Sequence, residues 1–151
     1  MADKPVAVKF DVEDDPDPLD IEFLETQIRR EASAAIGLGD EVELAIFVRD
    51  AGKVVAGISG WTWGDCCELQ SLWVDPSLRG RKLGSELLAA AESEAAARGC
   101  AQTVLFTYDF QAGSLYERAG YELAGRVEGF PSGTDVLWYR KRLNRSGLPP
   151  S

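Results

Sequence analysis

The sequence contains no histidine, and only three of its 151 residues are cysteine. The side chain that most often serves enzymes as a general base and as a metal ligand is therefore missing. Cys66, Cys67 and Cys100 are odd in number, lack a Cys-x-x-Cys spacing, and include an adjacent pair that would bridge only with strain. We expect neither a disulfide framework nor a metal centre, and we interpret the three thiols as strand or core residues.

Long apolar runs are also missing, and the acidic segment Met1–Asp20 lacks the basic and apolar regions of a secretory signal. These absences predict a cytoplasmic protein without a membrane partner. The formal net charge of -9 argues against a nucleic-acid partner and is compatible with a cationic substrate. With 45% hydrophobic residues, the chain can bury one sizeable core. We predict a single domain over residues 1–145 and a loose tail at 146–151.

Cations gather in one turn of this acidic chain, after a predicted strand and before a predicted helix. Amide groups in the first turn of a helix lack intrahelical partners, and the helix dipole favours negative charge there. A turn of this kind binds phosphate oxygens. The candidate phosphate-binding residues are Arg79, Gly80, Arg81, Lys82, Leu83, Gly84 and Ser85. We call this segment, Arg79–Ser85, the phosphate turn.

Periodicity and turn signals predict strands and helices that alternate along the chain. The expected strands are Val6–Phe10, Val42–Arg49, Lys53–Trp63, Cys66–Val74, Thr103–Tyr108, Tyr121–Val127 and Asp135–Leu143. The expected helices are Leu19–Ala35, Ser85–Arg98 and Ala112–Ala119. This order predicts an α/β architecture with a mixed sheet and crossover helices.

Two ordered motifs extend this interpretation. The segment Arg79–Gly84 (RGRKLG) is similar to the motif Gln/Arg-x-x-Gly-x-Gly/Ala. Lys82 stands at the position of the first Gly of that motif. Downstream, Ala112–Tyr121 looks like a short helix that carries a second motif, Tyr-x-x-x-Gly followed by an aromatic residue. Together they resemble the GNAT superfamily of N-acetyltransferases, over about Val42–Leu143. Because backbone amides are the donors, we expect phosphate binding to persist if Lys82 keeps an ordinary helical φ.

The resemblance implies a central mixed, twisted β-sheet of six to seven strands flanked by about four helices. It also implies acetyl-CoA as the acyl-donor cosubstrate, and it allows a homodimer. In the family, the strands corresponding to Cys66–Val74 and Thr103–Tyr108 splay apart and leave main-chain groups for the pantetheine arm, here those of Leu72, Trp73 and Val74. Gln111 lies where the family often has a polar contact to the cofactor.

An alkyl ammonium must lose a proton before it attacks a thioester, and the chain has no imidazole to remove that proton. Glu68 is the preferred base, because it precedes Val74 by an even step on one strand and several family members have a general-base Glu there. Glu43 and Asp109 are weaker candidates. The resemblance gives Tyr116 the role of protonating the leaving CoA thiolate. These residues predict an N-acetyltransferase acting on a small cationic amine or a protein amine by direct attack, without an acetyl-enzyme.

Plainer interpretations stay open. Tyr116 is alternatively a core aromatic, Glu68 an exposed strand residue, and the acidic run before the first helix a solvated loop. Trp61 and Trp63 suit either an acceptor wall or sheet packing. The whole chain is alternatively a non-catalytic acyl-CoA-binding module. A nucleotide-binding domain fits poorly, since no complete Gly-rich nucleotide motif is present.

Overall fold

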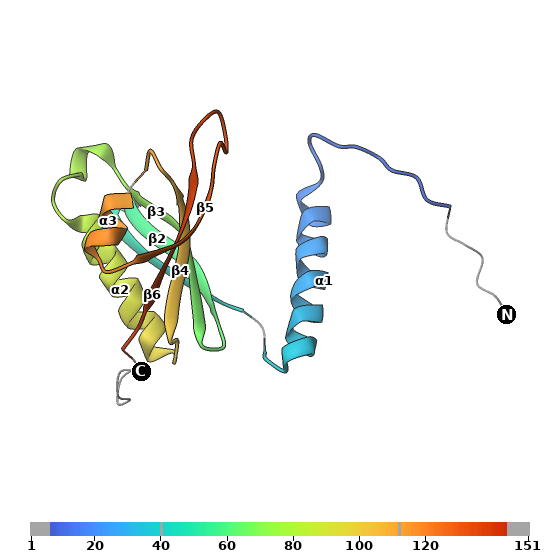
Figure 1. Ribbon diagram of the computed structural model, residues 1–151, viewed down its shortest axis with the longest axis horizontal. Coiled ribbons are helices and arrows are strands. Elements are labelled where there is room, and N and C mark those ends of the chain that lie inside the picture. The colour runs from blue at the N-terminus through green and yellow to red at the C-terminus, as the bar shows by residue number, and fades with distance from the viewer. Residues whose placement is uncertain (1–6, 40, 112, 145–151) are drawn as a thin grey trace. The chain divides into compact units, whose positions relative to one another are not determined.

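The computed structural model describes residues 7–39, 41–111 and 113–144, and contacts divide the chain into two units that meet between Gly37 and Leu38 (Figure 1). The first unit contains helix α1 (Pro18–Ile36). Asp17 caps this helix by accepting a hydrogen bond from the Leu19 amide at 2.9 Å, and left-handed Gly37 ends it. The predicted strand at Val6–Phe10 is wrong for residues 7–10, which have no regular structure; Val6 lies outside the described residues.

The second unit is a six-stranded sheet with the order β1-β2-β3-β4-β6-β5. Its strands are β1 (Val42–Asp50), β2 (Lys53–Trp63), β3 (Cys66–Val74), β4 (Gln102–Tyr108), β5 (Glu122–Val127) and β6 (Val136–Arg142). Its helices are the 3-10 turn η1 (Pro76–Leu78), α2 (Leu83–Ala97) and α3 (Gly113–Arg118). Only β3 and β4 pair in parallel within the described sheet, so the predicted mixed α/β architecture is confirmed.

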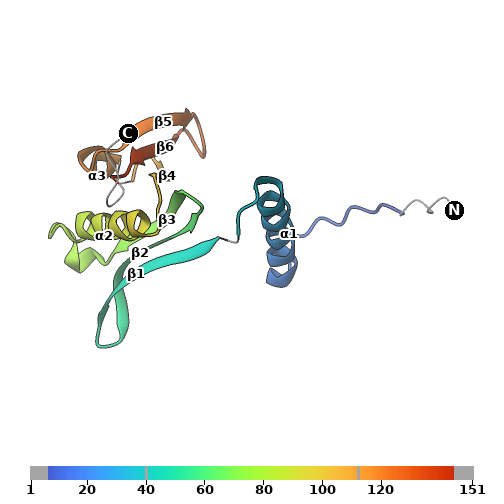
Figure 2. The same ribbon diagram turned by 90° about the horizontal axis from the view of Figure 1, so that it is seen from below.

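Helices α2 and α3 cover one face of this sheet (Figure 1 and Figure 2). Ala91 and Ala95 on α2 are fully buried, because their small side chains allow the helix to pack closely on the strands. The core that results is formed by Leu44, Ala56, Ile58, Cys67, Leu69, Leu87, Leu88, Ala91, Ala95, Cys100, Leu105, Tyr116, Tyr121, Leu137 and Tyr139. Within the described ranges no helix is long and apolar enough to cross a membrane.

Two of the three cysteines, Cys67 and Cys100, are part of this packing. Cys67 and Cys100 are buried, Cys66 is half-buried, and all three are free thiols. Burial raises the pKa of Cys67 to about 12 and also raises the pKa of Cys100. Both thiols are therefore protonated at neutral pH and are poor nucleophiles. No cluster of potential metal ligands occurs in the part of the chain that the structure describes.

A β-bulge interrupts β3 at Gln70. Ser59 pairs with Ser71, but Gly60 pairs with Leu69, so one extra residue lies on β3. The bulge reverses the alternation of side chains: Leu69 before it and Val74 after it both pack toward the core. The prediction that Glu68 and Val74 share a face, based on their even spacing, is therefore wrong. Glu68 lies on the sheet face opposite α2. The glycine inside the β2 pattern was the available signal.

Replacing Gly60 with Ala is expected to destabilise the protein strongly. A Cβ at this position would overlap the Glu68 carbonyl oxygen, which is backbone and cannot swing away. We expect a loss of about 3 kcal/mol or more in the free energy of unfolding, measured by urea denaturation. Gly125→Ala is the matched control, because a Cβ there has no atom within 4 Å. Equal stability of the two variants would contradict the close approach at the bulge.

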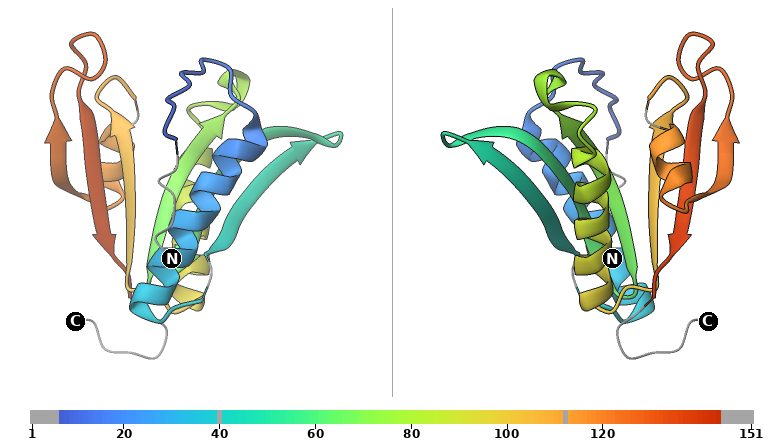
Figure 3. Two further views of the ribbon diagram at one scale, coloured as in Figure 1. Left: turned by 90° about the vertical axis from the view of Figure 1, so that its right-hand side faces the viewer. Right: turned by 90° about the vertical axis from the view of Figure 1, so that its left-hand side faces the viewer.

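Strands β3 and β4 separate after a short stretch of pairing. Their register runs from Cys66 opposite Gln102 to Leu69 opposite Leu105 and stops there. Beyond this point β3 continues only with β2, and β4 only with β6. Figure 3 shows the two halves of the sheet diverging. This is the divergence that the family resemblance implies, and we call it the β3–β4 split.

Candidate active site

The split exposes part of the main chain of β3. The Asp75 amide donates to the Val55 carbonyl of β2 at 2.9 Å. Since main-chain groups alternate in direction along a strand, those of Trp73 also point to β2, whereas those of Leu72 and Val74 point into the split. The expectation that Trp73 offers free main-chain groups is therefore wrong. The main-chain groups of Leu72 and the amide of Val74 retain that possibility, whereas the Val74 carbonyl oxygen accepts from Arg79.

The phosphate turn connects the end of β3 to helix α2. The Glu86 amide donates to the Lys82 carbonyl at 3.0 Å and is the first to bond in helical fashion. The amides of Leu83, Gly84 and Ser85 precede it and have no partner among the described residues. These three donors lie at the positive end of the helix dipole, so an anion is favoured here.

Lys82 does not have the ordinary helical φ that we expected. Its φ is 62° and its ψ 12°, the left-handed conformation, and its side chain makes no capping hydrogen bond. Two residues of the connection between η1 and α2 are left-handed, Gly80 with φ 79° and Lys82. The sequence motif that Arg79–Gly84 resembles has glycine at the position of Lys82, and glycine adopts this conformation without strain.

Replacing Lys82 with Gly is expected to raise the free energy of unfolding by roughly 0.5–1 kcal/mol, because relief of left-handed strain exceeds the added chain entropy. Chemical denaturation measures this change. Lys82→Ala is the control, since it removes the same charge but keeps the backbone strain. We expect its free energy of unfolding not to rise. A larger gain for the Ala variant than for the Gly variant would contradict the strain interpretation.

The three cations of the phosphate turn differ in whether they already have a hydrogen-bond partner in the protein. Arg79 donates from Nε to the Val74 carbonyl oxygen at 3.1 Å and so fixes the end of β3. Arg81 and Lys82 are exposed, and neither makes a hydrogen bond or ion pair within the described ranges. Arg81 and Lys82 are therefore the cations best placed to neutralise phosphate.

Helix α3 meets both the phosphate turn and the split. A Cβ added to Gly84 would lie 3.7 Å from Leu115 of α3 and 3.9 Å from Val74 of β3. Three segments that are distant in sequence thus converge at one point. Tyr116, the next residue after Leu115, is brought to the same region.

Tyr116 belongs to a cluster of three tyrosines. Its ring lies 5.9 Å from that of Tyr121 and 6.0 Å from that of Tyr139. The Tyr121 hydroxyl bonds to Thr103 and the Tyr139 hydroxyl to Glu117. The Tyr116 hydroxyl has no partner among the described residues and is not fully enclosed. Burial raises the pKa of Tyr116, so its phenol holds its proton at neutral pH.

Glu68 lies beside the closed end of the split, one residue before pairing stops. It is half-buried between Trp61 of β2 and Val104 of β4 on the face opposite α2. Burial raises the pKa of Glu68, and the nearby Glu41 carboxylate raises it further. The Glu68 carboxyl group and the Tyr116 phenol thus lie on opposite faces of the sheet, with the split beside them.

Two of the other candidate residues, Gln111 and Asp109, have hydrogen-bond partners within the protein. The Gln111 side-chain oxygen accepts hydrogen bonds from the Thr107 hydroxyl and the Tyr108 amide, both at 3.1 Å, which close the turn after β4. The Asp109 carboxylate accepts from the Asp135 amide at 3.0 Å. Glu43 on β1 is exposed and pairs in register with Trp61, one strand farther from the split than Glu68.

Arg118 had no predicted role, although it lies inside the second motif, two residues after Tyr116. A basic residue at the end of a short helix is usually explained by the helix dipole. Only the three-dimensional structure shows that Arg118 lines a pocket together with residues of α2.

Comparison with known proteins agrees with this geometry. Residues 8–121 match the model of the acetyltransferase (GNAT) family. The chain is 34% identical over 111 residues to acetyltransferase Atu2258 of Agrobacterium fabrum, covering 73% of this chain and 81% of that protein. It is 39% identical over 88 residues to blasticidin-S acetyltransferase of Streptomyces morookaense. That match covers 56% of this chain and 62% of the relative, slightly less than two thirds of its length.

The solved structures agree as well. The crystal structure of an acetyltransferase from Agrobacterium tumefaciens superimposes with a TM-score of 0.82 and 29% sequence identity, covering 90% of this chain and all of that one. The fold and the site are therefore those of an acetyltransferase. The chain belongs to the acetyltransferase (GNAT) family.

Proposed function

We propose that this protein transfers the acetyl group of acetyl-CoA to a primary amine by direct attack, without an acetyl-enzyme. The observation that carries the proposal is the convergence at Gly84, where the phosphate turn, the split and the helix bearing Tyr116 meet. A binding site for an extended phosphorylated thioester and a proton donor are thereby brought together.

The residues present fit acetyl-CoA. The amides of Leu83–Ser85, with Arg81 and Lys82, would hold its pyrophosphate. The main-chain groups of Leu72 and the amide of Val74 would pair with its pantetheine arm as an added strand does. Acetyl-CoA supplies an activated thioester, whose carbonyl carbon accepts the amine nitrogen.

In the proposed reaction the N–C bond forms and the C–S bond breaks. Glu68, directly or through water, takes a proton from the acceptor ammonium, and the neutral amine then attacks the thioester. The nitrogen of the tetrahedral intermediate loses a second proton to solvent as the amide forms. A β3 amide near Val74 stabilises the oxyanion that develops on the carbonyl oxygen. Tyr116 gives its proton to the leaving thiolate. The buried thiols of Cys67 and Cys100, with their raised pKa values, argue against an acetyl-cysteine intermediate.

The surroundings of Glu68 favour a cationic acceptor. Glu43, Trp61 and Glu68 are register neighbours on one face of the sheet, so an aromatic ring lies between two carboxyl groups. An ammonium group interacts favourably with both kinds of side chain. Because one relative is a blasticidin-S acetyltransferase, blasticidin S is the first acceptor to test, followed by polyamines, aminoglycosides, amino acids and Lys-containing peptides.

Thiol release from acetyl-CoA by the purified protein tests the proposal. We expect release that requires one acceptor class and depends on Tyr116. Thermal stabilisation by acetyl-CoA without release for any acceptor would favour a non-catalytic acyl-CoA-binding module instead. The Tyr116 hydroxyl has no hydrogen-bond partner among the described residues, and this argues against that alternative. A purely structural tyrosine in this cluster would be expected to form a hydrogen bond within the protein, as Tyr121 and Tyr139 do.

A further inference from the structure

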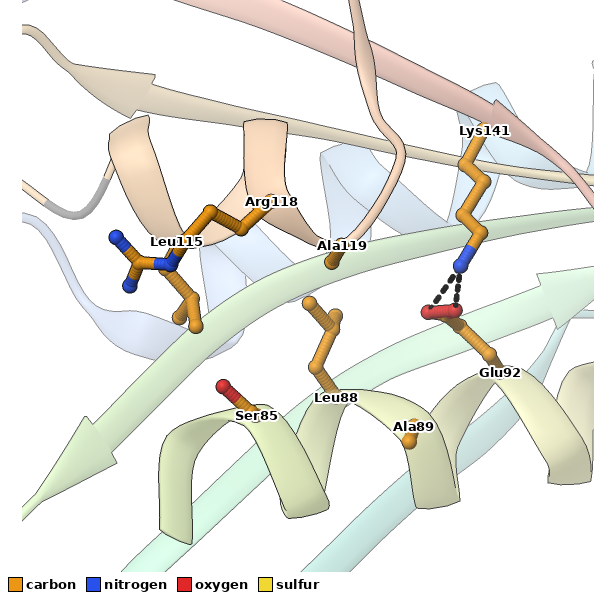
Figure 4. A pocket seen from close by; sticks show the side chains of 8 residues that line it. All are labelled: Ser85, Leu88, Ala89, Glu92, Leu115, Arg118, Ala119 and Lys141. Carbon is orange, nitrogen blue, oxygen red and sulfur yellow. Dashed lines mark hydrogen bonds and ion pairs between the residues drawn. The ribbon is translucent and has the colours of Figure 1, made fainter. Parts of the chain in front are cut away.

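Four aromatic side chains gather on the sheet face opposite α2. Leu105 of β4 packs in the core under α2, so its neighbour Phe106 points to the opposite face, and Tyr108 follows two residues later. Trp138 of β6 is in register with Phe106, and Phe110 lies in the turn after β4. We call Phe106, Tyr108, Phe110 and Trp138 the aromatic strip. The pocket of about 250 Å³ between α2 and α3 (Figure 4) lies on the α2 face and is a separate feature.

The four rings form one continuous surface. The centroids of Phe106 and Trp138 are 5.1 Å apart, and Phe106 and Tyr108 meet edge to face at 6.5 Å. Tyr108 in turn stacks on Phe110 at 5.3 Å, with ring planes 3° apart. Phe106 is nevertheless 40% and Trp138 38% exposed, and Gly125 beside Trp138 contributes no side chain that would cover the indole. Apolar side chains that are exposed together, unlike scattered ones, are typical of a binding surface.

The aromatic strip begins where the β3–β4 split opens. Val104 of β4 is in register with Glu68 of β3, so these two side chains share a face. Phe106 lies two residues further along β4, about 7 Å from Val104, and follows Leu105, where the pairing of the two strands stops. A carboxyl group at the closed end of the split and an aromatic surface along its β4 side are therefore neighbours on one face.

These two neighbours attract different chemical groups. The Glu68 carboxyl group favours an ammonium. The faces and edges of the Phe106 and Trp138 rings favour another flat ring, which can stack on them or meet them edge to face. A linear polyamine or a puckered amino sugar covers flat rings less completely. The arrangement is therefore suited to a ligand that has an amine at one end and a flat ring at the other.

We infer that the acetyl acceptor is an amine with a flat aromatic ring on a short linker, and that Phe106 and Trp138 bind this ring while Glu68 faces the amine. The spacing of about 7 Å between the two features corresponds to a linker of a few carbon atoms. The inference rests on the proposed function for the role of the amine, but binding of the ring can be measured without acetyl transfer.

Calorimetric titration of the purified protein, saturated with coenzyme A, tests the inference with 2-phenylethylamine and 2-cyclohexylethylamine. Both ligands carry the same aminoethyl group on a six-membered ring, but only the first ring is flat. Coenzyme A has no acetyl group to transfer, so only binding is measured. We expect 2-phenylethylamine to bind about fivefold more tightly, the scale of one aromatic ring pair.

Substitutions in the aromatic strip should remove this preference. Phe106→Leu should weaken the binding of 2-phenylethylamine alone, because it keeps an apolar side chain but removes the flat ring. Trp138→Leu should act in the same way, and Phe106→Tyr should keep the preference. Phe47→Leu is the matched control, because Phe47 is 50% exposed on β1, away from the split, and its loss should change neither affinity.

Three results would overturn the inference. The first is equal affinity of the wild type for the two amines, or a Phe106→Leu variant that retains the preference. The second is tighter binding of 1,4-diaminobutane than of 2-phenylethylamine, which would assign the aromatic strip to a second ammonium group. The third is a wild-type dimer that Phe106→Leu dissociates, measured by analytical ultracentrifugation, which would assign the strip to a second copy of the chain.

Thiol release from acetyl-CoA separates this inference from the proposed function. Release with aliphatic amines, together with equal binding of the flat and the puckered ring, would overturn the inference and leave the proposed function standing. Preferred binding of 2-phenylethylamine without release for any amine would contradict the proposed function and support the aromatic strip as a ring-binding site.

Discussion

Replacing Tyr116 with Phe is expected to lower turnover by roughly 10²-fold or more while the affinity for coenzyme A changes little. The substitution removes only the hydroxyl, which has no hydrogen-bond partner among the described residues, so the packing against Tyr121 and Tyr139 is preserved. Without this donor the thiolate must leave unprotonated or take its proton from water. Steady-state kinetics with the acceptor found in the panel, together with calorimetry for coenzyme A, measures both quantities.

Tyr121→Phe is the control for this experiment. Its hydroxyl is committed to Thr103 at 3.2 Å inside the core, so its loss should cost about 1 kcal/mol of stability and leave turnover nearly unchanged. Tyr116→Phe should show the opposite pattern. Unchanged turnover in Tyr116→Phe would remove this residue from the mechanism, and a loss of stability without a loss of turnover would assign it to the core.

Replacing Glu68 with Gln is expected to lower turnover by about 10²-fold at neutral pH, with a loss that shrinks as the pH approaches 10. An alkyl ammonium has a pKa near ~10, so the acceptor deprotonates unaided at high pH and no longer needs a base. Burial and Glu41 raise the pKa of Glu68, so the acid limb of the wild-type pH profile should lie above that of an ordinary carboxyl group. A pH-independent loss would instead indicate a role in binding or folding.

The same substitution has an expected effect on stability. The pKa of Glu68 is raised in the folded state, so its protonation stabilises the fold in acid, and this contribution disappears as the pH rises through the folded pKa. Glu68→Gln removes the cost of a partly buried charge. The variant should therefore melt slightly above the wild type at pH 7, and this difference should vanish below the ordinary carboxyl range. Glu43→Gln, on an exposed neighbour, should leave the melting temperature unchanged at both pH values.

Local sequence pattern was sufficient for most elements of the second unit. Strands β2 and β3 have the predicted bounds, because the turn residues between them and the alternating side chains are both local signals. The turn before α2 could also be predicted, since a basic, glycine-containing turn before a helix is defined by consecutive residues. Val6–Phe10 shows the limit of this approach: a short alternation predicts a strand, but hydrogen bonding to a neighbouring strand is what makes one.

Three features of the site were decided only by contacts between distant residues. The bulge at Gln70 moves Glu68 to the other face, because Gly60 lets the β3 backbone approach β2 closely. The connection from η1 to α2 holds Lys82 in a left-handed conformation that its residue type disfavours. Thr103 and Glu117 provide partners for two phenols of the cluster, and the third, Tyr116, is left available.

The sequence by itself thus determined the order of the elements, the turn suited to phosphate and the residue types available for acid and base chemistry. The tertiary structure decided which faces those residues occupy and which of them are already committed to other partners. The physical reason is that periodicity and turn preference act between neighbours in the chain. Bulges, side-chain hydrogen bonds and pockets depend instead on which distant segments pack together.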